Sequence, residues 1–202
     1  MKISKTKSTK YWKHLEARIE QDFDNEELWE EAFDLFNERL THRYLEPIKS
    51  IEANDDFTGQ GFAIMTIHCS LIEFLETTYQ GINFNIKQKK KSKYKYGLGY
   101  SKSIFISFLT NRKPFLIEKS IATAFYKSVR CGLLHEAKLG KNWKIRVDNS
   151  KVINCKEGKY TVNRKIFSKR IKQYLTLYNK KLKKDKKLKK AFIRKFNYLS
   201  QE

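Results

Sequence analysis

The sequence predicts a mostly α-helical fold, a helical bundle that carries a small β-hairpin or flap near residues 143–162. The helices are predicted by the scarcity of turn-forming residues, with 8 glycines and 2 prolines among 202 residues, and by long amphipathic stretches. A packed core is predicted because hydrophobic residues make up 40% of the chain despite its high charge. Residues 1–24 are expected to form an N-terminal segment, 25–183 the helical domain, and 184–202 a C-terminal helix.

The first long helix is expected to begin at Asp24, because an N-cap residue followed three positions later by Glu27 matches a capping box. Apolar side chains then recur at helical spacing as far as Tyr44. Pro47 is expected to end or redirect this helix.

The most apolar stretch predicts a second, buried helix over 62–79, with Gly81 as its C-terminal stop. This stretch is too short for a membrane span, and His68 and Glu73 interrupt it, so we expect no membrane partner. We expect His68 to be a satisfied core histidine. The alternative is that His68 or Glu73 lines a cleft opposite His135.

The second half of the chain is expected to alternate between helices and one small sheet. Residues 82–102 indicate an exposed, mobile loop, 103–109 a short helix, and Pro114 the first residue of a helix that runs to His135. From Trp143 the apolar period changes to two, which predicts a β-hairpin or three-stranded flap. Helix is expected to resume around Arg164.

The C-terminal segment 184–202 is dense in lysine, yet its apolar residues keep helical spacing and form one stripe. Such a basic amphipathic helix suits docking on its own domain, on RNA or on anionic lipid. We expect docking on its own domain. The residues of the stripe are Leu188, Phe192, Phe196 and Leu199.

Charge is distributed unevenly along the chain, which has a net charge of +21. Residues 1–60 carry a net charge of −5, residues 61–135 carry +9, and residues 136–202 carry +17. An acidic first third followed by a strongly basic remainder favours a polyanionic partner, of which nucleic acid is the commonest. The alternative is a lysine-rich composition without functional meaning.

The three cysteines, Cys69, Cys131 and Cys155, are widely spaced and form no CxxC motif, so neither a disulfide framework nor a zinc site is expected. The basic N-terminus is not followed by an apolar segment, so it does not resemble a signal peptide. We expect a cytoplasmic protein that needs no metal and no other cofactor.

The strongest candidate for contacts with an RNA backbone and with unpaired bases is the loop over 82–102, where lysines and tyrosines are interleaved. A solvated loop is the alternative. Two further lysines flank the helix that ends at His135. The expected RNA-binding residues are Lys87, Lys89, Lys90, Lys91, Lys93, Tyr94, Lys95, Tyr96, Lys127 and Lys138.

Arg130 and His135 offer the chemistry of RNA transesterification. A near-neutral imidazole can take the proton of a 2′-hydroxyl, and a guanidinium can stabilise the charge that develops on the phosphate. Cys131 follows Arg130 and shares a helix ridge with His135. One such pair lacks a general acid for the leaving oxygen, so the chemistry calls for a dimer that supplies a second pair.

The spacing of Arg130 and His135 also fits a purely structural arrangement. Arg130 would then pair with a carboxylate such as Glu73 or Glu76, and His135 would cap the end of its helix. Gly132 between them weakens a helix, which indicates close approach by another backbone, a ligand, or the helix end.

The run from Ser128 to Glu136, with its Arg130-x4-His135 motif, resembles the HEPN (higher eukaryote and prokaryote nucleotide-binding) family. The segments 43–48 and 71–76 are also similar to bacterial HEPN-like proteins linked to phage defence, and the resemblance covers residues 25–180. It implies an all-α bundle and a metal-independent, dimeric endoribonuclease with Arg130, His135 and Cys131 at its site.

Within this family, many members are toxins or abortive-infection effectors, so an antitoxin or another defence-system protein is an implied partner. Some members have lost activity and only bind RNA or nucleotides, which is the alternative function for this chain. The position after the motif arginine is often Asn or another strongly polar residue, whereas this chain has Cys131.

Overall fold

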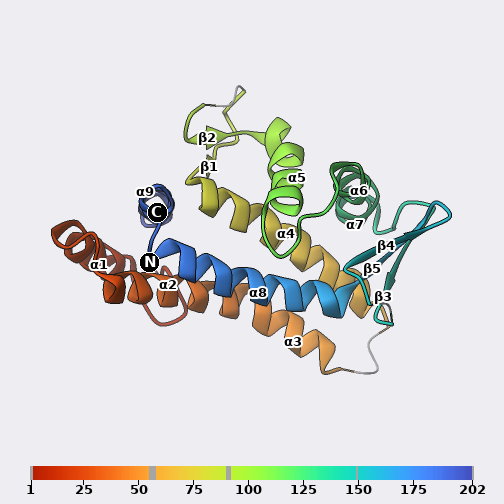
Figure 1. Ribbon diagram of the computed structural model, residues 1–202, viewed down its shortest axis with the longest axis horizontal. Helices are drawn as coiled ribbons and strands as arrows, with labels where there is room; N and C mark the ends of the chain where they lie inside the picture. The colour runs from red at the N-terminus through yellow and green to blue at the C-terminus, as the bar shows by residue number, and fades with distance from the viewer. Residues whose placement is uncertain (1, 55–57, 90–91, 149, 202) are drawn as a thin grey trace. The chain divides into compact units, whose positions relative to one another are not determined.

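The computed structural model describes residues 2–54, 58–89, 92–148 and 150–201, and it is mostly helical, as predicted (Figure 1). The chain forms two compact units. Unit 1 comprises residues 1–47, 75–100 and 175–202, and unit 2 comprises residues 48–74 and 101–174. None of the described helices combines the length and the apolar character needed to cross a bilayer.

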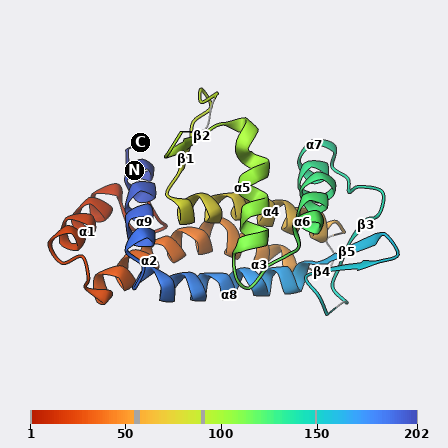
Figure 2. The ribbon, with the colours of Figure 1, turned by 45° about the horizontal axis from the view of Figure 1, so that its top comes forward.

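Unit 1 is built from helices α1 (Thr9–Gln21), α2 (Glu26–Leu40) and α9 (Lys186–Leu199), with the C-terminal ends of α4 (Gln60–Gln80) and α8 (Arg164–Leu182). Figure 2 shows α9 beside α1 and α2. The buried face of α9 places Phe192 and Phe196 against Trp12, with ring centroids 5.9 and 5.0 Å apart, and both rings also contact Phe36. The expected docking of the C-terminal helix on its own domain is therefore confirmed.

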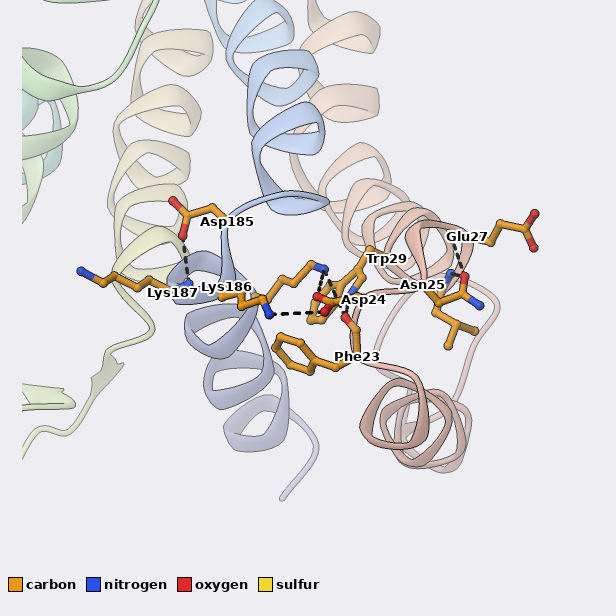
Figure 3. A network of polar contacts seen from close by, with 10 residues as sticks. Phe23, Asp24, Asn25, Glu27, Trp29, Asp185, Lys186 and Lys187 are labelled. Carbon is orange, nitrogen blue, oxygen red and sulfur yellow. Dashed lines mark hydrogen bonds and ion pairs between the residues drawn. The ribbon is translucent and has the colours of Figure 1, made fainter.

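The start of α2 corrects the predicted capping box. Asn25, not Asp24, is the N-cap, and its side chain accepts hydrogen bonds from the amides of Glu27 and Leu28. Asp24 instead pairs with the Lys186 ammonium at 3.3 Å, and its pKa is lowered by that contact (Figure 3). The capping-box pattern indicated the wrong N-cap because Lys186, far along the chain, forms an ion pair with the Asp24 carboxylate.

The helical path does not end at Pro47. Between α2 and α3 (Glu46–Glu52), the chain takes one π-helical turn over Thr41–Leu45. A wider turn accommodates a residue without a backbone N–H, because the hydrogen bonds of the preceding turn are already displaced.

The expected loop at 82–102 contains more regular structure than predicted. Strands β1 (Asn83–Phe84) and β2 (Lys95–Tyr96) pair in parallel, and a 3-10 turn follows over Leu98–Tyr100. Gly81 has a φ of +63°, which confirms its role at the end of α4 (Gln60–Gln80), the helix expected over 62–79.

Unit 2 contains most of α4 and the helices α5 (Ser101–Asn111), α6 (Lys119–Phe125) and α7 (Gly132–Glu136), together with the first part of α8 (Arg164–Leu182). Its core is rich in phenylalanine. Among the described residues, the phenylalanines that are fully buried in this core are Phe105, Phe108, Phe125 and Phe167.

Pro114 does not start a helix, contrary to the prediction, and α6 begins at Lys119. After α5 the chain folds back on the end of that helix, where the amide of Ile117 donates to the carbonyl of Leu109 at 2.8 Å. Leu116 has a φ of +44°, which no helix allows. Contacts with the preceding helix therefore override the preference of proline for a first helical position.

The predicted flap is a three-stranded sheet formed by β3 (Trp143–Arg146), β4 (Ile153–Lys156) and β5 (Lys159–Asn163), in the order β3-β5-β4. β5 pairs antiparallel with β4 and parallel with β3. Figure 1 shows this sheet next to α6 and α7. Trp143 joins the sheet to the helices, because its ring stacks on Tyr160 at 4.6 Å and meets Phe125 edge-on.

Candidate active site

Arg130 and His135 lie on one continuous helical path that changes its winding between them. α6 leads into a π-helical segment, Tyr126–Cys131, and α7 follows directly from Gly132. Such π-turns occur frequently at functional sites. The wider winding means that the angle between the two side chains does not follow from α-helical spacing alone.

Gly132 allows another stretch of backbone to approach the helix, which is one of the three explanations that the sequence left open. A Cβ built at this position would lie 2.4 Å from the carbonyl oxygen of Lys138. Two backbone hydrogen bonds hold the returning chain, from Lys138 to Gly132 at 3.2 Å and from Gly140 to Ser128 at 2.8 Å. The residues after α7 therefore fold back along its surface.

His135 is exposed at the end of α7 and lines an open pocket of about 360 Å³. The pocket lies between the π-turn, α7 and the returning chain. Its lining residues are Lys127, Ser128, Cys131, Gly132, His135, Glu136, Lys138, Leu139 and Gly140. The imidazole is therefore accessible to a ligand, with two lysines and a hydroxyl on the same pocket.

Arg130 points to a different set of side chains. Its guanidinium pairs with the Glu73 carboxylate, at 2.9 Å from Nη2 and 3.0 Å from Nε to Oε1. Ser101 bridges the pair, because its hydroxyl donates to Glu73 Oε2 at 2.5 Å and accepts from Arg130 Nη2 at 3.2 Å. The structural alternative thus describes Arg130 correctly, with Glu73 and not Glu76 as its partner.

The electrostatics of Arg130 follow from this pair. Burial, the largest single influence, would lower the pKa of the guanidinium, but Glu73, Tyr126 and Cys131 together outweigh burial and the pKa is raised. The guanidinium also lies 5.4 Å from the ring centroid of Tyr126. Burial raises the pKa of Tyr126, with Arg130 acting in the opposite direction. Arg130 is therefore a firmly charged, well-supported side chain.

Of the three expected site residues, His135 and Cys131 share the pocket, whereas Arg130 does not line it. Within one chain the structure thus separates the guanidinium from the imidazole. Ser101 was not predicted, because a serine at the start of an apolar helix has no sequence pattern that sets it apart.

His68 is buried, and its Nε2 lies 2.8 Å from Ser168 Oγ. Its ring packs on Phe167 at 5.1 Å, and burial lowers its pKa to about 3. The expectation of a core histidine is confirmed, with one qualification: Nδ1 has no hydrogen-bond partner among the described residues.

The expected RNA-binding loop belongs to unit 1, whereas Lys127 and Lys138 belong to unit 2. Tyr96 is buried against Phe84, so the expectation that it stacks on a base is wrong. The Arg194 guanidinium lies over one face of the Tyr94 ring, 4.4 Å from its centroid, and Tyr94 is still 39% exposed.

The remaining residues of that prediction are lysines. Lys127 and Lys138 are exposed, as are four lysines of the loop, and two more fall outside the described residues. The exposed loop lysines are Lys87, Lys89, Lys93 and Lys95, and the two outside the description are Lys90 and Lys91.

Over the described ranges, no group of three or more His, Cys, Asp or Glu side chains is arranged to hold a metal ion. Comparison with protein-family models, with curated proteins and with solved structures found no match to this chain.

Proposed function

We propose that this chain is a metal-independent endoribonuclease of the HEPN type, with an HEPN-like helical bundle, that cleaves RNA by attack of the 2′-hydroxyl. The observation that carries the proposal is the exposed His135 on a pocket that also presents Lys127 and Lys138. An accessible imidazole can serve as general base or acid, and the two ammonium groups can hold the phosphates on either side of the scissile bond.

In the proposed reaction, His135 takes the proton of the 2′-hydroxyl, and that oxygen attacks the adjacent phosphorus. Arg130 stabilises the negative charge of the phosphate. Its Nε and Nη2 are engaged by Glu73 and Ser101, while Nη1 has no hydrogen-bond partner among the described residues. A phosphate would therefore meet a charged arginine that is held in place by Glu73.

A second copy of the chain completes the proposed site. The 5′-oxygen leaves with a proton, and a single imidazole that is accepting the proton of the 2′-hydroxyl cannot at the same moment donate a proton to the leaving oxygen. A two-fold dimer would bring a second His135 and a second Arg130 to the same cleft. The resemblance to HEPN toxins and abortive-infection effectors adds a cytoplasmic role in phage defence, with an antitoxin or another defence-system protein as partner.

A catalytically inactive RNA- or nucleotide-binding module is the second candidate, and two observations favour it. The charge of Arg130 is already balanced by the Glu73 carboxylate, and Arg130 does not line the pocket that His135 lines. The thiol of Cys131, which does line that pocket, is a weak hydrogen-bonding group. Both features weaken phosphate activation without preventing RNA binding.

The deciding experiment is RNA cleavage by the purified chain with and without a chelator, using labelled single-stranded RNA. We expect products with 2′,3′-cyclic phosphate ends in both conditions. His135→Ala should lower the rate by about 10²–10⁴-fold. His14→Ala, at an exposed histidine of unit 1, is the matched control and should cleave like the wild type.

Cleavage that is indifferent to His135→Ala would overturn the proposed enzyme. The binding module would be established instead if the RNA stays intact and binds equally to the wild type and to His135→Ala. Its affinity should then fall steeply as the salt concentration rises.

A further inference from the structure

The segment between α4 and α5 displays aliphatic side chains next to lysines on the surface of unit 1. Ile86 and Leu98 are 71% and 70% exposed, and Phe84 is 39% exposed. We call these side chains and the four lysines around them the 82–100 surface. Its residues are Phe84, Ile86, Leu98, Lys87, Lys89, Lys93 and Lys95.

Ordered backbone holds the two aliphatic side chains outward. β1 and β2 pair in parallel with Phe84 opposite Tyr96, so Ile86 and Leu98 each follow a paired position by two residues. The amide of Asn85 donates to the Tyr96 carbonyl at 2.9 Å. The exposure of Ile86 and Leu98 is thus a property of a hydrogen-bonded segment.

Unit 1 also anchors the base of this segment to α9. The hydroxyl of Tyr198 donates to the carbonyl oxygen of Phe84 at 2.9 Å. Arg194 donates to the carbonyl of Gly81 at 3.4 Å and lies over one face of the Tyr94 ring. A surface supported in this way keeps its apolar side chains in place when it meets a partner.

The charge of the segment is entirely positive. From Thr77 to Tyr100 the sequence contains six lysines and no Asp or Glu. None of the four described loop lysines forms an ion pair with a described carboxylate; Lys93 lies over the Tyr94 ring at 5.2 Å. The natural partner of such a surface is anionic.

The side chains available distinguish between two anionic partners. Binding of unpaired RNA bases relies on aromatic faces, but Tyr96 is buried and Arg194 lies over one face of the Tyr94 ring, so Tyr94 and Phe84, each 39% exposed, are only partly open. The most exposed apolar groups, Ile86 and Leu98, are aliphatic and cannot stack on bases. Aliphatic side chains surrounded by lysines match the acyl boundary and the phosphates of an anionic bilayer.

We propose that the 82–100 surface docks peripherally on an anionic phospholipid bilayer, with Ile86 and Leu98 entering the interface and the lysines binding lipid phosphates. The apolar stripe of α9 does not serve this purpose, because Phe192 and Phe196 are buried in the core of unit 1. The contact is independent of the proposed RNA cleavage and departs from the expectation that no membrane takes part.

Co-sedimentation of the full chain with vesicles tests this proposal. Vesicles of phosphatidylcholine mixed with phosphatidylserine should retain the protein, and phosphatidylcholine alone should not. Replacing the four loop lysines with Gln should weaken binding at least about tenfold. The double variant Ile86→Ser/Leu98→Ser should weaken it about tenfold with no change of charge.

Two matched controls separate this surface from overall charge and overall hydrophobicity. The first control replaces four exposed lysines of unit 2 with Gln: Lys144, Lys151, Lys156 and Lys159. This variant has the same net charge as the loop variant and should bind vesicles more tightly than the loop variant does. Leu177→Ser, at an exposed leucine of α8, should bind like the wild type.

The proposal is overturned if the protein does not co-sediment with the anionic vesicles. It is also overturned if Ile86→Ser/Leu98→Ser binds them unchanged, or if both lysine variants weaken binding equally. If the variant without the four loop lysines loses RNA binding but still binds vesicles, the surface is an RNA-binding surface.

Discussion

The Arg130 guanidinium and the Glu73 carboxylate form an ion pair with an Nη2–Oε1 distance of 2.9 Å, and Ser101 closes the network from the start of α5. The side chains of Arg130 and Glu73 are 16% and 19% exposed. The pair therefore ties the π-turn to α4 in a partly desolvated environment. It also means that any phosphate bound by Arg130 competes with a carboxylate.

Breaking this pair from either side should destabilise the chain. Glu73→Gln leaves a largely buried guanidinium without its counter-charge, and Arg130→Met leaves the carboxylate without its partner, so each should cost about 1–3 kcal/mol. The double variant Glu73→Gln/Arg130→Met removes both charges and should lose less than the sum of the two. Urea unfolding of the four proteins measures this coupling. Strict additivity would show that the pair contributes nothing.

Gly132→Ala should destabilise the chain although alanine is the better helix former. The gain of helix propensity is about 1 kcal/mol, but the new methyl group would lie 2.4 Å from the Lys138 carbonyl oxygen. Backbone has to move to relieve such a contact, and overpacking of this kind costs about 1–3 kcal/mol. Gly99→Ala is the control, because a Cβ there meets no atom within 4 Å. A more stable Gly132→Ala protein would contradict the close approach.

Much of the fold could be predicted from sequence because its signals are local. The apolar run that forms α4, the change of period at Trp143 and the resumption of helix at Arg164 each depend on neighbouring residues. The predictions at Asp24 and Pro114 were wrong because distant contacts decide them: Lys186 takes the carboxylate of Asp24, and the end of α5 folds the chain around Pro114.

The candidate site was predictable only in part. The helix was expected to run to His135, and α7 ends one residue later, at Glu136; Cys131 lies one turn before His135. The partner of Arg130 could not be chosen from sequence, because Glu73 and Glu76 are both on α4 and only packing selects between them. The π-turn likewise leaves no pattern in the sequence that would reveal the separation of Arg130 from the pocket.

Acid should destabilise the chain through His68. Its pKa is lowered by burial to about 3, while in the unfolded chain it lies near 6.5. Between these values the unfolded state binds the extra proton, so the free energy of unfolding falls as the pH falls through this window. The contribution amounts to about 2–3 kcal/mol between about pH 7 and about pH 4.5.

The measurement for His68 is urea unfolding of wild type and His68→Gln across this pH range. Carboxylates add their own pH dependence to both proteins, so the difference between the two curves isolates the histidine. The difference should narrow or reverse as the pH falls. Parallel curves would show that His68 is not buried in its neutral form.

Alkaline conditions should stabilise the chain through Lys195 on α9. The ammonium is buried, donating to Thr77 Oγ1 at 3.2 Å and to the Ile82 carbonyl at 3.1 Å. Burial, reinforced by Arg39, lowers the pKa of Lys195 to about 7, whereas the unfolded value is 10.5. Between these values the unfolded state binds more protons, so the free energy of unfolding rises with pH, by about 2–3 kcal/mol from about pH 7 to about pH 9.

Lys195→Met tests this linkage, because a methionine fills much of the same space and carries no proton. Its free energy of unfolding should lack the rise seen in the wild type over the same pH range. Lys187→Met, at an exposed lysine of the same helix, should keep the rise. The range ends below the pKa of Tyr11, which a hydrogen bond to Glu31 raises to about 12. A wild type whose stability is flat between about pH 7 and about pH 9 would mean that the Lys195 amine stays charged and hydrated in the folded chain.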